Sequence, residues 1–183
     1  MIKQDTRRIL ADAFVELLQK NSYESVSVSD IAAACGASRQ TFYNYFHDKH
    51  DLAVWIARQD ADFDAGRPDR RSFWKLQLDY LNAMTKRLEF YRKAFSAREQ
   101  NSLLLTSLSD GVSYCTALIE RQQQRPPDER QRFLLQASVY ALVMMRLEWL
   151  RDGCPVSPEV FCERISAMIP AEIQVFLNVV GAS

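Results

Sequence analysis

Glycine and proline are scarce in this chain, and they limit where its regular elements can end. Only five glycines and six prolines occur in 183 residues, and several stand between stretches whose apolar residues recur at helical spacing. Turn-rich β architectures need many such residues, so this distribution favours long helices. A hydrophobic content of 48% is ample for a packed core, and 25% charged residues is ordinary for a soluble surface. We therefore expect an all-α fold of one or two compact units.

The beginning of the chain predicts a helix that buries one face. Its apolar residues follow a helical period and form a single stripe: Ile9, Leu10, Ala13, Phe14, Leu17 and Leu18. The helix is expected to end before residues 21–23. Ser27 can cap a second, short helix, with Asp30 three residues later in a capping-box position. Gly36 can end that helix in the left-handed conformation.

The next signals predict a helix-turn-helix. Ser38 can cap a third helix running through Phe46, only two residues after the second helix ends. Residues 48–51 repeat the capping pattern before a fourth helix. Two short helices separated by a Gly-containing turn form the helix-turn-helix arrangement.

A linker separates these helices from the C-terminal part of the chain. Residues 60–71 turn acidic and then read Gly-Arg-Pro-Asp at 66–69. Breaks at 125–128 and 153–155 divide the C-terminal part. We expect helices over 72–87, 89–123 with a break near 96–101, 128–152 and 157–179. The chain is thus predicted to hold two domains, residues 1–58 and 59–183, the second an antiparallel helical bundle.

The third predicted helix holds the side chains that indicate a function. Phe42 and Phe46 lie four residues apart and should face the core formed by the first two helices. The opposite face holds polar side chains: Arg39, Gln40, Tyr43 and Asn44. Arginine matches the O6 and N7 acceptors of guanine, while asparagine or glutamine matches N6 and N7 of adenine. Hydroxyl and ammonium groups nearby can reach phosphate oxygens, and we select Ser38, Thr41, Tyr43 and Lys49 for this role.

Residues 28–52, and most clearly Thr-Phe-Tyr-Asn-Tyr-Phe at 41–46 followed by Asp48-Lys49, resemble the DNA-binding signature of the tetracycline-repressor family of bacterial transcription regulators. The resemblance implies a homodimer whose third helices enter successive major grooves of an operator. It implies an N-terminal three-helix DNA-binding domain and a C-terminal ligand-sensing and dimerisation domain. By position, the base readers would be Arg39, Gln40 and Asn44. The phosphate contacts would be Ser27, Ser38, Thr41, Tyr43, Tyr45 and Lys49.

The C-terminal part resembles one branch of this family. Residues 89–95, 100–102 and 148–153 are similar to the C-terminal region of regulators near the dihydroxyacetone-kinase operon activator. That branch includes members that take their signal from a partner protein. The resemblance therefore leaves two sources for the signal, a small-molecule effector or a partner protein.

Large aromatic and Met side chains in the second domain have two readings, simple core packing or an apolar cavity with few polar anchors. The cavity hypothesis selects Trp74, Tyr80, Tyr91, Phe95, Tyr114, Tyr140 and Met144 as ligand-binding residues. Polar groups such as Gln77 or Arg146 would orient the ligand. The last two predicted helices carry more apolar surface than one bundle needs, which predicts that two copies pair through them.

Other function classes find little support. The two histidines, His47 and His50, have no nucleophile, carboxylate or ligand set in a catalytic or metal-binding order, so neither an enzyme nor a metal site is expected, nor a cofactor. We expect His47 and His50 to be solvated or to lie near phosphate. The four cysteines lack close pairing and predict free thiols in a reducing compartment.

Charge and hydropathy complete the prediction. The net charge is zero and the first fifty residues are nearly balanced, so DNA affinity must depend on local contacts. The start has no apolar signal-peptide core, and no segment approaches the roughly 18 uninterrupted apolar residues of a membrane span. We expect a cytoplasmic regulator, more specifically a repressor, without membrane contact. The alternative is a helical adaptor or co-regulator that acts through a partner protein.

Overall fold

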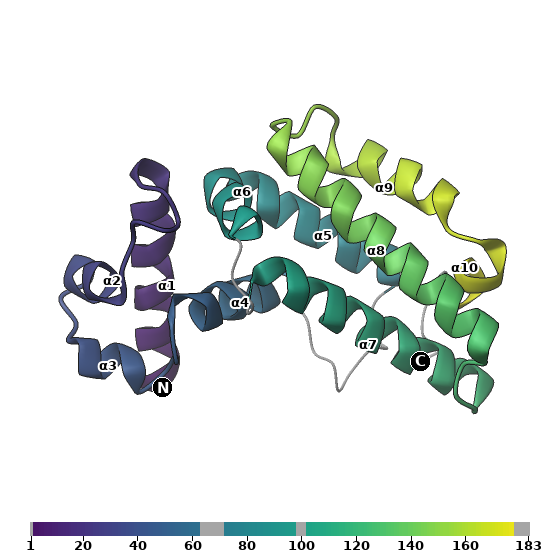
Figure 1. The fold of residues 1–183 in the computed structure, drawn as a ribbon, viewed down its shortest axis with the longest axis horizontal. Coiled ribbons are helices and arrows are strands. Elements are labelled where there is room, and N and C mark those ends of the chain that lie inside the picture. The colour runs from purple at the N-terminus through teal and green to yellow at the C-terminus, as the bar shows by residue number, and fades with distance from the viewer. Residues whose placement is uncertain (1, 63–71, 98–101, 178–183) are drawn as a thin grey trace.

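The computed structural model describes residues 2–62, 72–97 and 102–177, and every regular element within these ranges is an α-helix (Figure 1). This confirms the predicted all-α fold. The helices have the following bounds: α1 Ile2–Lys20, α2 Val28–Ala34, α3 Arg39–Tyr43, α4 Lys49–Asp60, α5 Phe73–Lys86, α6 Leu88–Ser96, α7 Leu103–Gln123, α8 Glu129–Arg151, α9 Pro158–Met168 and α10 Ala171–Leu177.

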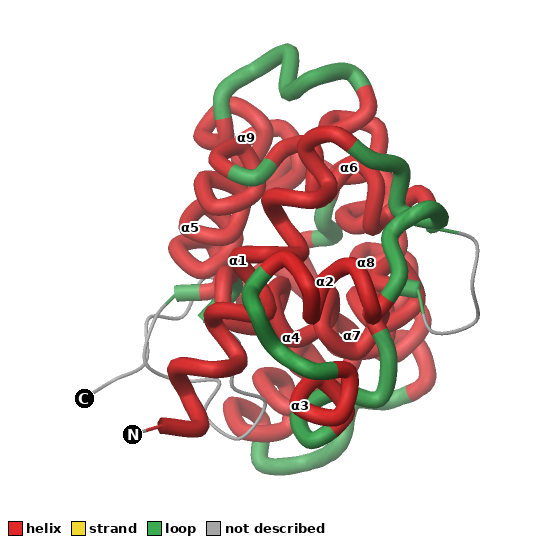
Figure 2. Tube along the Cα trace, turned by 90° about the vertical axis from the view of Figure 1, so that its left-hand side faces the viewer, coloured by secondary structure: helices red, strands yellow, loops and turns green. Residues whose placement is uncertain are grey.

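Helices α1, α2 and α3 form one end of the molecule, and α4 leads from them into a larger helical bundle (Figure 1). Seen from that end, α1, α2 and α3 lie in front of the bundle (Figure 2). The predicted local signals are confirmed here. Ser27 and Asp30 form a capping box at α2, Ser38 accepts a hydrogen bond from the Thr41 backbone at α3, and Gly36 has φ +70° in the turn between them.

Two predicted helices end earlier than expected. The third helix stops at Tyr43, where Asn44 forms the C-cap, instead of continuing to Phe46. The chain leaves the helix there because the residues that follow form the N-terminus of α4. The Asp48 side chain caps that helix, and the Asp51 carboxylate accepts the His47 backbone N–H at 3.0 Å.

The predicted helix over 157–179 is divided into α9 and α10. Ile169 is extended, with φ −78° and ψ 128°, and Pro170 follows it. A proline has no backbone N–H and its ring disfavours helical backbone in the preceding residue, so the helix ends there. The predicted break in 89–123 is confirmed as the gap between α6 and α7. Of the predicted linker, residues 63–71 lie outside the described residues, as do residues 100 and 101 of the C-terminal resemblance.

The N-terminal helices pack directly on the bundle. The Phe14 ring of α1 meets the Phe90 ring of α6 edge to face at 6.0 Å, and the Lys93 ammonium donates to the Leu18 carbonyl at 2.7 Å. At the end of α4, Asp60 accepts hydrogen bonds from Arg87 and Tyr91. One apolar core therefore runs from α1 to α10. The predicted boundary after residue 58 falls within the last turn of α4, and the division into two domains stays a prediction.

Helix α8 runs through the centre of the bundle beside α7 (Figure 1). Among the described residues it is the one helix long and apolar enough, by length and composition, to cross a membrane, and 44% of its most apolar window is buried inside the protein. The core helix of a soluble protein passes the same test, so this is weak evidence for a membrane span.

Candidate DNA-binding surface and adjoining cavity

Helix α3 presents the predicted polar face to solvent. Phe42 and Phe46 are buried, and the Phe46 ring packs against Trp55 of α4 at 5.9 Å. This contact anchors the short helix by its apolar side. The opposite side chains are all exposed: Arg39, Gln40, Tyr43 and Asn44. The arrangement of the two faces is therefore confirmed, while the contacts of these side chains with DNA stay a prediction.

The exposed side chains of α3 are held in pairs four residues apart. The Arg39 guanidinium lies 6.0 Å from the centre of the Tyr43 ring, and the Gln40 amide donates to the Asn44 side-chain oxygen at 3.3 Å. These contacts restrict the rotamers of the candidate base readers before any DNA arrives. Ordering side chains costs conformational entropy, and these contacts order part of the exposed face within the protein itself.

Most of the candidate phosphate contacts lie at the N-termini of α2 and α3. Ser27 and Ser38 hold the N-termini of α2 and α3, and their hydroxyls also bond Asp30 at 2.6 Å and Thr41 at 2.9 Å. Hydrogen bonds from Ser27 lower the pKa of Asp30, so this carboxylate is charged and makes the start of α2 less favourable for a phosphate. Tyr45 is half-buried, and Arg7 of α1 lies 6.0 Å from its ring centre. The start of α3 is the better anion site of the two.

The sequence predicted a phosphate contact for Lys49, but its ammonium hydrogen-bonds the protein's own backbone. Its ammonium donates to the backbone carbonyls of Tyr23 at 2.7 Å, Val26 at 3.0 Å and Glu24 at 3.4 Å, and lies 4.9 Å from the centre of the Tyr23 ring. The ammonium therefore stabilises the loop between α1 and α2, because it donates to carbonyl groups that lie outside the helices and accept no helical hydrogen bond. A phosphate role for this lysine would require it to leave three acceptors.

Replacing Lys49 with Met is expected to lower the free energy of unfolding by about 1–3 kcal/mol, because it leaves partly buried carbonyls without a donor. The slope of DNA affinity against salt should not change. Urea unfolding and binding titrations at several salt concentrations measure the two quantities. Lys20→Met, at an exposed position in the last turn of α1, is the control. A stable Lys49→Met protein whose salt slope is flatter by about one would instead support the phosphate contact.

The two histidines have different environments. His47 is exposed, as expected, but His50 is only 6% exposed and its Nδ1 lies 3.0 Å from the Tyr23 hydroxyl. The prediction of a solvated or phosphate-proximal His50 was therefore wrong. Its position in the first turn of α4 places it under the loop between α1 and α2, where the neighbouring Lys49 also points.

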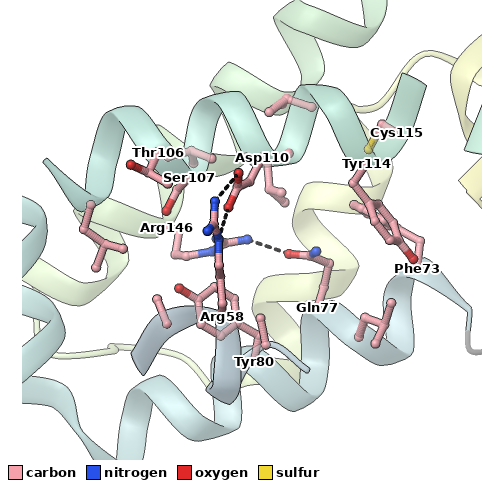
Figure 3. A pocket seen from close by; sticks show the side chains of 18 of the residues that line it. Arg58, Phe73, Gln77, Tyr80, Thr106, Ser107, Asp110, Tyr114, Cys115 and Arg146 are labelled. Atoms are coloured by element: carbon pink, nitrogen blue, oxygen red, sulfur yellow. Dashed lines mark hydrogen bonds and ion pairs between the residues drawn. The ribbon is translucent and has the colours of Figure 1, made fainter. Parts of the chain in front are cut away.

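A cavity of about 320 Å³ lies between α4, α5, α7 and α8 (Figure 3). Most of its wall is apolar. Its lining comprises Val54, Ala57, Arg58, Ala61, Asp62, Phe73, Leu76, Gln77, Tyr80, Leu103, Thr106, Ser107, Asp110, Gly111, Tyr114, Cys115, Val139, Leu142, Val143 and Arg146. Its volume is at the lower end of the range for small-molecule sites, roughly 300–1,000 Å³.

Two arginines reach the cavity and differ in their partners. Arg58 of α4 forms a two-point ion pair with Asp110 of α7, at 2.8 and 3.0 Å, and this hydrogen bonding raises its pKa. Arg146 of α8 donates to the Gln77 side-chain oxygen at 2.5 Å and lies 5.0 Å from the centre of the Tyr80 ring. Burial lowers the pKa of Arg146, and its Nε has no hydrogen-bond partner among the described residues.

Only two of the seven predicted ligand-binding residues, Tyr80 and Tyr114, line this cavity. Tyr91 and Phe95 are buried in the core of α6, and Trp74 packs edge to face on Phe73 at 5.0 Å. The remaining two, Tyr140 and Met144, lie on the exposed face of α8. Size and aromatic character do not determine which side of a helix faces a cavity.

The sequence carries a periodic signal for the side of α8 that faces the cavity. Its lining residues recur at helical spacing and define one face: Val139, Leu142, Val143 and Arg146. A helix turns about 100° per residue, so Tyr140 and Met144 lie on a different face. On α7, a Cβ at Gly111 would lie 2.9 Å from the Val139 side chain, which shows how closely α7 and α8 approach at this wall. Arg58 of α4 and the lining residues of α7 other than Tyr114 were not predicted.

The cysteines are free, as predicted: Cys35, Cys115, Cys154 and Cys162. Burial raises the pKa of the Cys115 thiol, which lines the cavity, to about 12. This thiol is protonated and unreactive at neutral pH. Among the described residues, no group of His, Cys, Asp and Glu side chains could hold a metal ion.

Sequence comparison places both parts of the chain. The family described as "Bacterial regulatory proteins, tetR family" matches residues 10–54, and the one described as "Transcriptional regulator C-terminal region" matches residues 75–171, more than half of the chain. The chain belongs to the tetR family of bacterial regulatory proteins. This is a family of transcriptional regulators, which are not enzymes, and the predicted helix-turn-helix lies within the first match.

The resemblance to the dihydroxyacetone-kinase activator branch is also confirmed. The HTH-type dhaKLM operon transcriptional activator DhaS of Lactococcus lactis subsp. lactis (strain IL1403) is 37% identical over 91 residues, which are 49% of each protein, so the alignment spans about half of that relative. The solved structure of a dihydroxyacetone kinase operon activator DhaS matches with a TM-score of 0.69 and 26% identity, over 94% of this chain and 98% of that one.

A third similarity supports the fold alone. The structure of NalD, the secondary repressor of the MexAB-OprM multidrug efflux pump in Pseudomonas aeruginosa, matches with a TM-score of 0.65 and 19% identity, over 91% of this chain and 95% of NalD. An activator and a repressor are thus both among the similar proteins. The fold does not determine the sign of regulation, and repression stays a prediction for this regulator.

Proposed function

We propose that this regulator binds a specific operator by inserting α3 into the major groove of DNA. The observation that carries the proposal is the exposed row of Arg39, Gln40 and Asn44 on a helix whose opposite face is anchored in the core. These side chains carry the donors and acceptors that distinguish guanine and adenine edges. Backbone N–H groups at the start of α3, with Ser38 and Thr41, supply phosphate contacts.

The same proposal includes a homodimer. Three large apolar side chains form a stripe along the outside of α8: Phe133 is 72% exposed, Tyr140 45% and Met144 43%. On α9, Val160 and Met168 are also exposed apolar residues. A stripe of this kind is costly in water, and two copies would bury it by forming a four-helix bundle around a two-fold axis. The axis would place two α3 helices one DNA turn apart, about 34–36 Å, on a near-palindromic site.

Residues 59–183 would then act as the sensing and dimerisation domain. Helix α4 supplies Val54, Ala57 and Arg58 to the cavity wall, and two polar links join it to the bundle. Arg58 links α4 to Asp110, and Tyr80 packs edge to face on Tyr91, whose hydroxyl donates to Asp60 at the end of α4. A ligand that separates these walls can tilt α4, and with it α3. A coupling free energy of about 1–3 kcal/mol would change operator affinity roughly 5–150-fold.

The alternative, a signal from a partner protein, needs no internal cavity. An effector-sized space bounded by α4 favours the small-molecule mode, because its volume is large enough for a ligand and its wall is mostly apolar. We place the regulator in the cytoplasm, where an operator would be accessible to it.

Binding to DNA from the intergenic region upstream of the regulator's own gene tests the proposal, measured with the purified dimer against a scrambled duplex of the same length. We expect a shift specific to the intergenic DNA, with an affinity that falls steeply as salt rises, because phosphate contacts release counterions. Equal binding to both duplexes, or no salt-dependent binding at all, would instead support the adaptor function.

A further inference from the structure

The cavity contains a buried positive charge that no acidic group among the described residues neutralises. Arg146 is 4% exposed, yet among the described residues no carboxylate oxygen forms an ion pair with it. Its partners are the neutral Gln77 side chain and the face of the Tyr80 ring, and its Nε has no acceptor. A buried ion without a counter-charge is expensive, and natural proteins rarely keep one without a reason.

The other charged groups at the cavity leave this excess in place. Asp110 is already committed to Arg58 by two hydrogen bonds, and Asp62 is exposed at the end of α4. Gln77, Tyr80 and Arg146 come together from α5 and α8 on one side of the cavity, as Figure 3 shows. Leu76, Leu142 and Val143 add apolar surface to the wall of the cavity.

We propose that the cavity takes an organic monocarboxylate whose charged group binds the Arg146 guanidinium and whose apolar body fills the space toward α7. This inference rests on the proposed effector role of the cavity and names the chemical class of its ligand. A carboxylate supplies the missing counter-charge and the acceptors that a guanidinium binds in pairs. The small volume and apolar wall require a compact body. A phosphate dianion fits less well, because one arginine does not balance its two charges.

Calorimetric titration of the full-length dimer tests this assignment. The probes are phenylacetate, indole-3-acetate and octanoate, each compared with its neutral primary amide, which has nearly the same shape. At least one acid should bind at least roughly 10-fold more tightly than its amide, the difference expected for a hydrogen-bonded charge. Arg146→Met should remove this preference and Arg146→Lys should retain it. Arg151→Met, which removes an exposed arginine from the same helix, should leave it unchanged.

The helical signal in far-UV circular dichroism and the molecular mass in solution verify that each variant is folded and dimeric. If Arg146→Met does not fold, Arg146→Gln, which keeps a donor for Gln77, takes its place. The assignment is overturned if no acid binds at millimolar concentration, if acids and amides bind the wild type equally, or if the preference survives loss of the charge. Equal binding of acid and amide would still leave an effector cavity. Absence of operator binding by the wild type would contradict the proposed function without affecting the carboxylate preference.

Discussion

Operator affinity is expected to fall about 10- to 100-fold when Arg39 or Asn44 is replaced by alanine. Each side chain can make a bidentate contact with one base, and such a contact discriminates by about 1–3 kcal/mol. Both side chains are exposed, and Asn44 caps α3 through its backbone, so the fold should tolerate the changes. Fluorescence anisotropy on the operator and on duplexes with single base changes measures affinity and preference together.

Duplexes with single base changes show whether a side chain of α3 contacts a base or only lies near the DNA. An alanine variant should lose discrimination at one or two positions of each half-site and keep it elsewhere. Gln19→Ala, an exposed change on α1, is the control and should bind like the wild type. If both α3 variants retain full affinity and full base preference, α3 is not the recognition helix.

The second large effect is expected at the outer face of α8, where Met144→Glu should convert the dimer to a monomer. Two charges would be buried against each other across the two-fold axis. A monomer reaches only one half-site, so operator affinity should fall by a factor of about 10² to 10⁴, the usual gain from linking two binding sites. Sedimentation velocity at micromolar concentration and operator titration measure the two effects.

Leu105→Glu is the matched control for this variant. Leu105 is also an exposed apolar residue, 50% exposed, but it lies on α7. It should remain a dimer and bind DNA normally. If Met144→Glu stays a dimer with unchanged operator affinity, the symmetric interface is elsewhere. A wild-type protein that is a stable monomer at micromolar concentration would also rule out the proposed dimer.

Local sequence signals predicted the helix-turn-helix well. The capping residues Ser27, Ser38 and Asp48 and the glycine at 36 act through groups within a few residues along the chain, so their effect does not depend on the rest of the fold. The burial of Phe42 and Phe46 was also predicted, although α3 ends at Tyr43 and Phe46 packs against Trp55 of α4.

Two features of the N-terminal part that the sequence did not show, the wrongly predicted His50 environment and the carbonyl contacts of Lys49, have a tertiary cause. Lys49 and His50 stand in a stretch that reads as a polar loop, and nothing nearby shows that both turn inward. They do so because the loop after α1 brings the Tyr23 hydroxyl and three backbone carbonyls to the start of α4. Such partners are more than twenty residues away in the chain, and only folding brings them close.

The helices, most of their ends, the polar face of α3 and the family could all be predicted from the amino-acid sequence. The face of α8 that meets the cavity could not, because that helix is apolar on more than one side: Val139 and Val143 line the cavity while Tyr140 and Met144 face solvent. Only the packing of α8 against α7 and α6 selected between those faces. The pairing of Arg58 with Asp110, and the lack of a carboxylate for Arg146, likewise follow from the tertiary arrangement, since ion pairs between helices depend on how the helices cross.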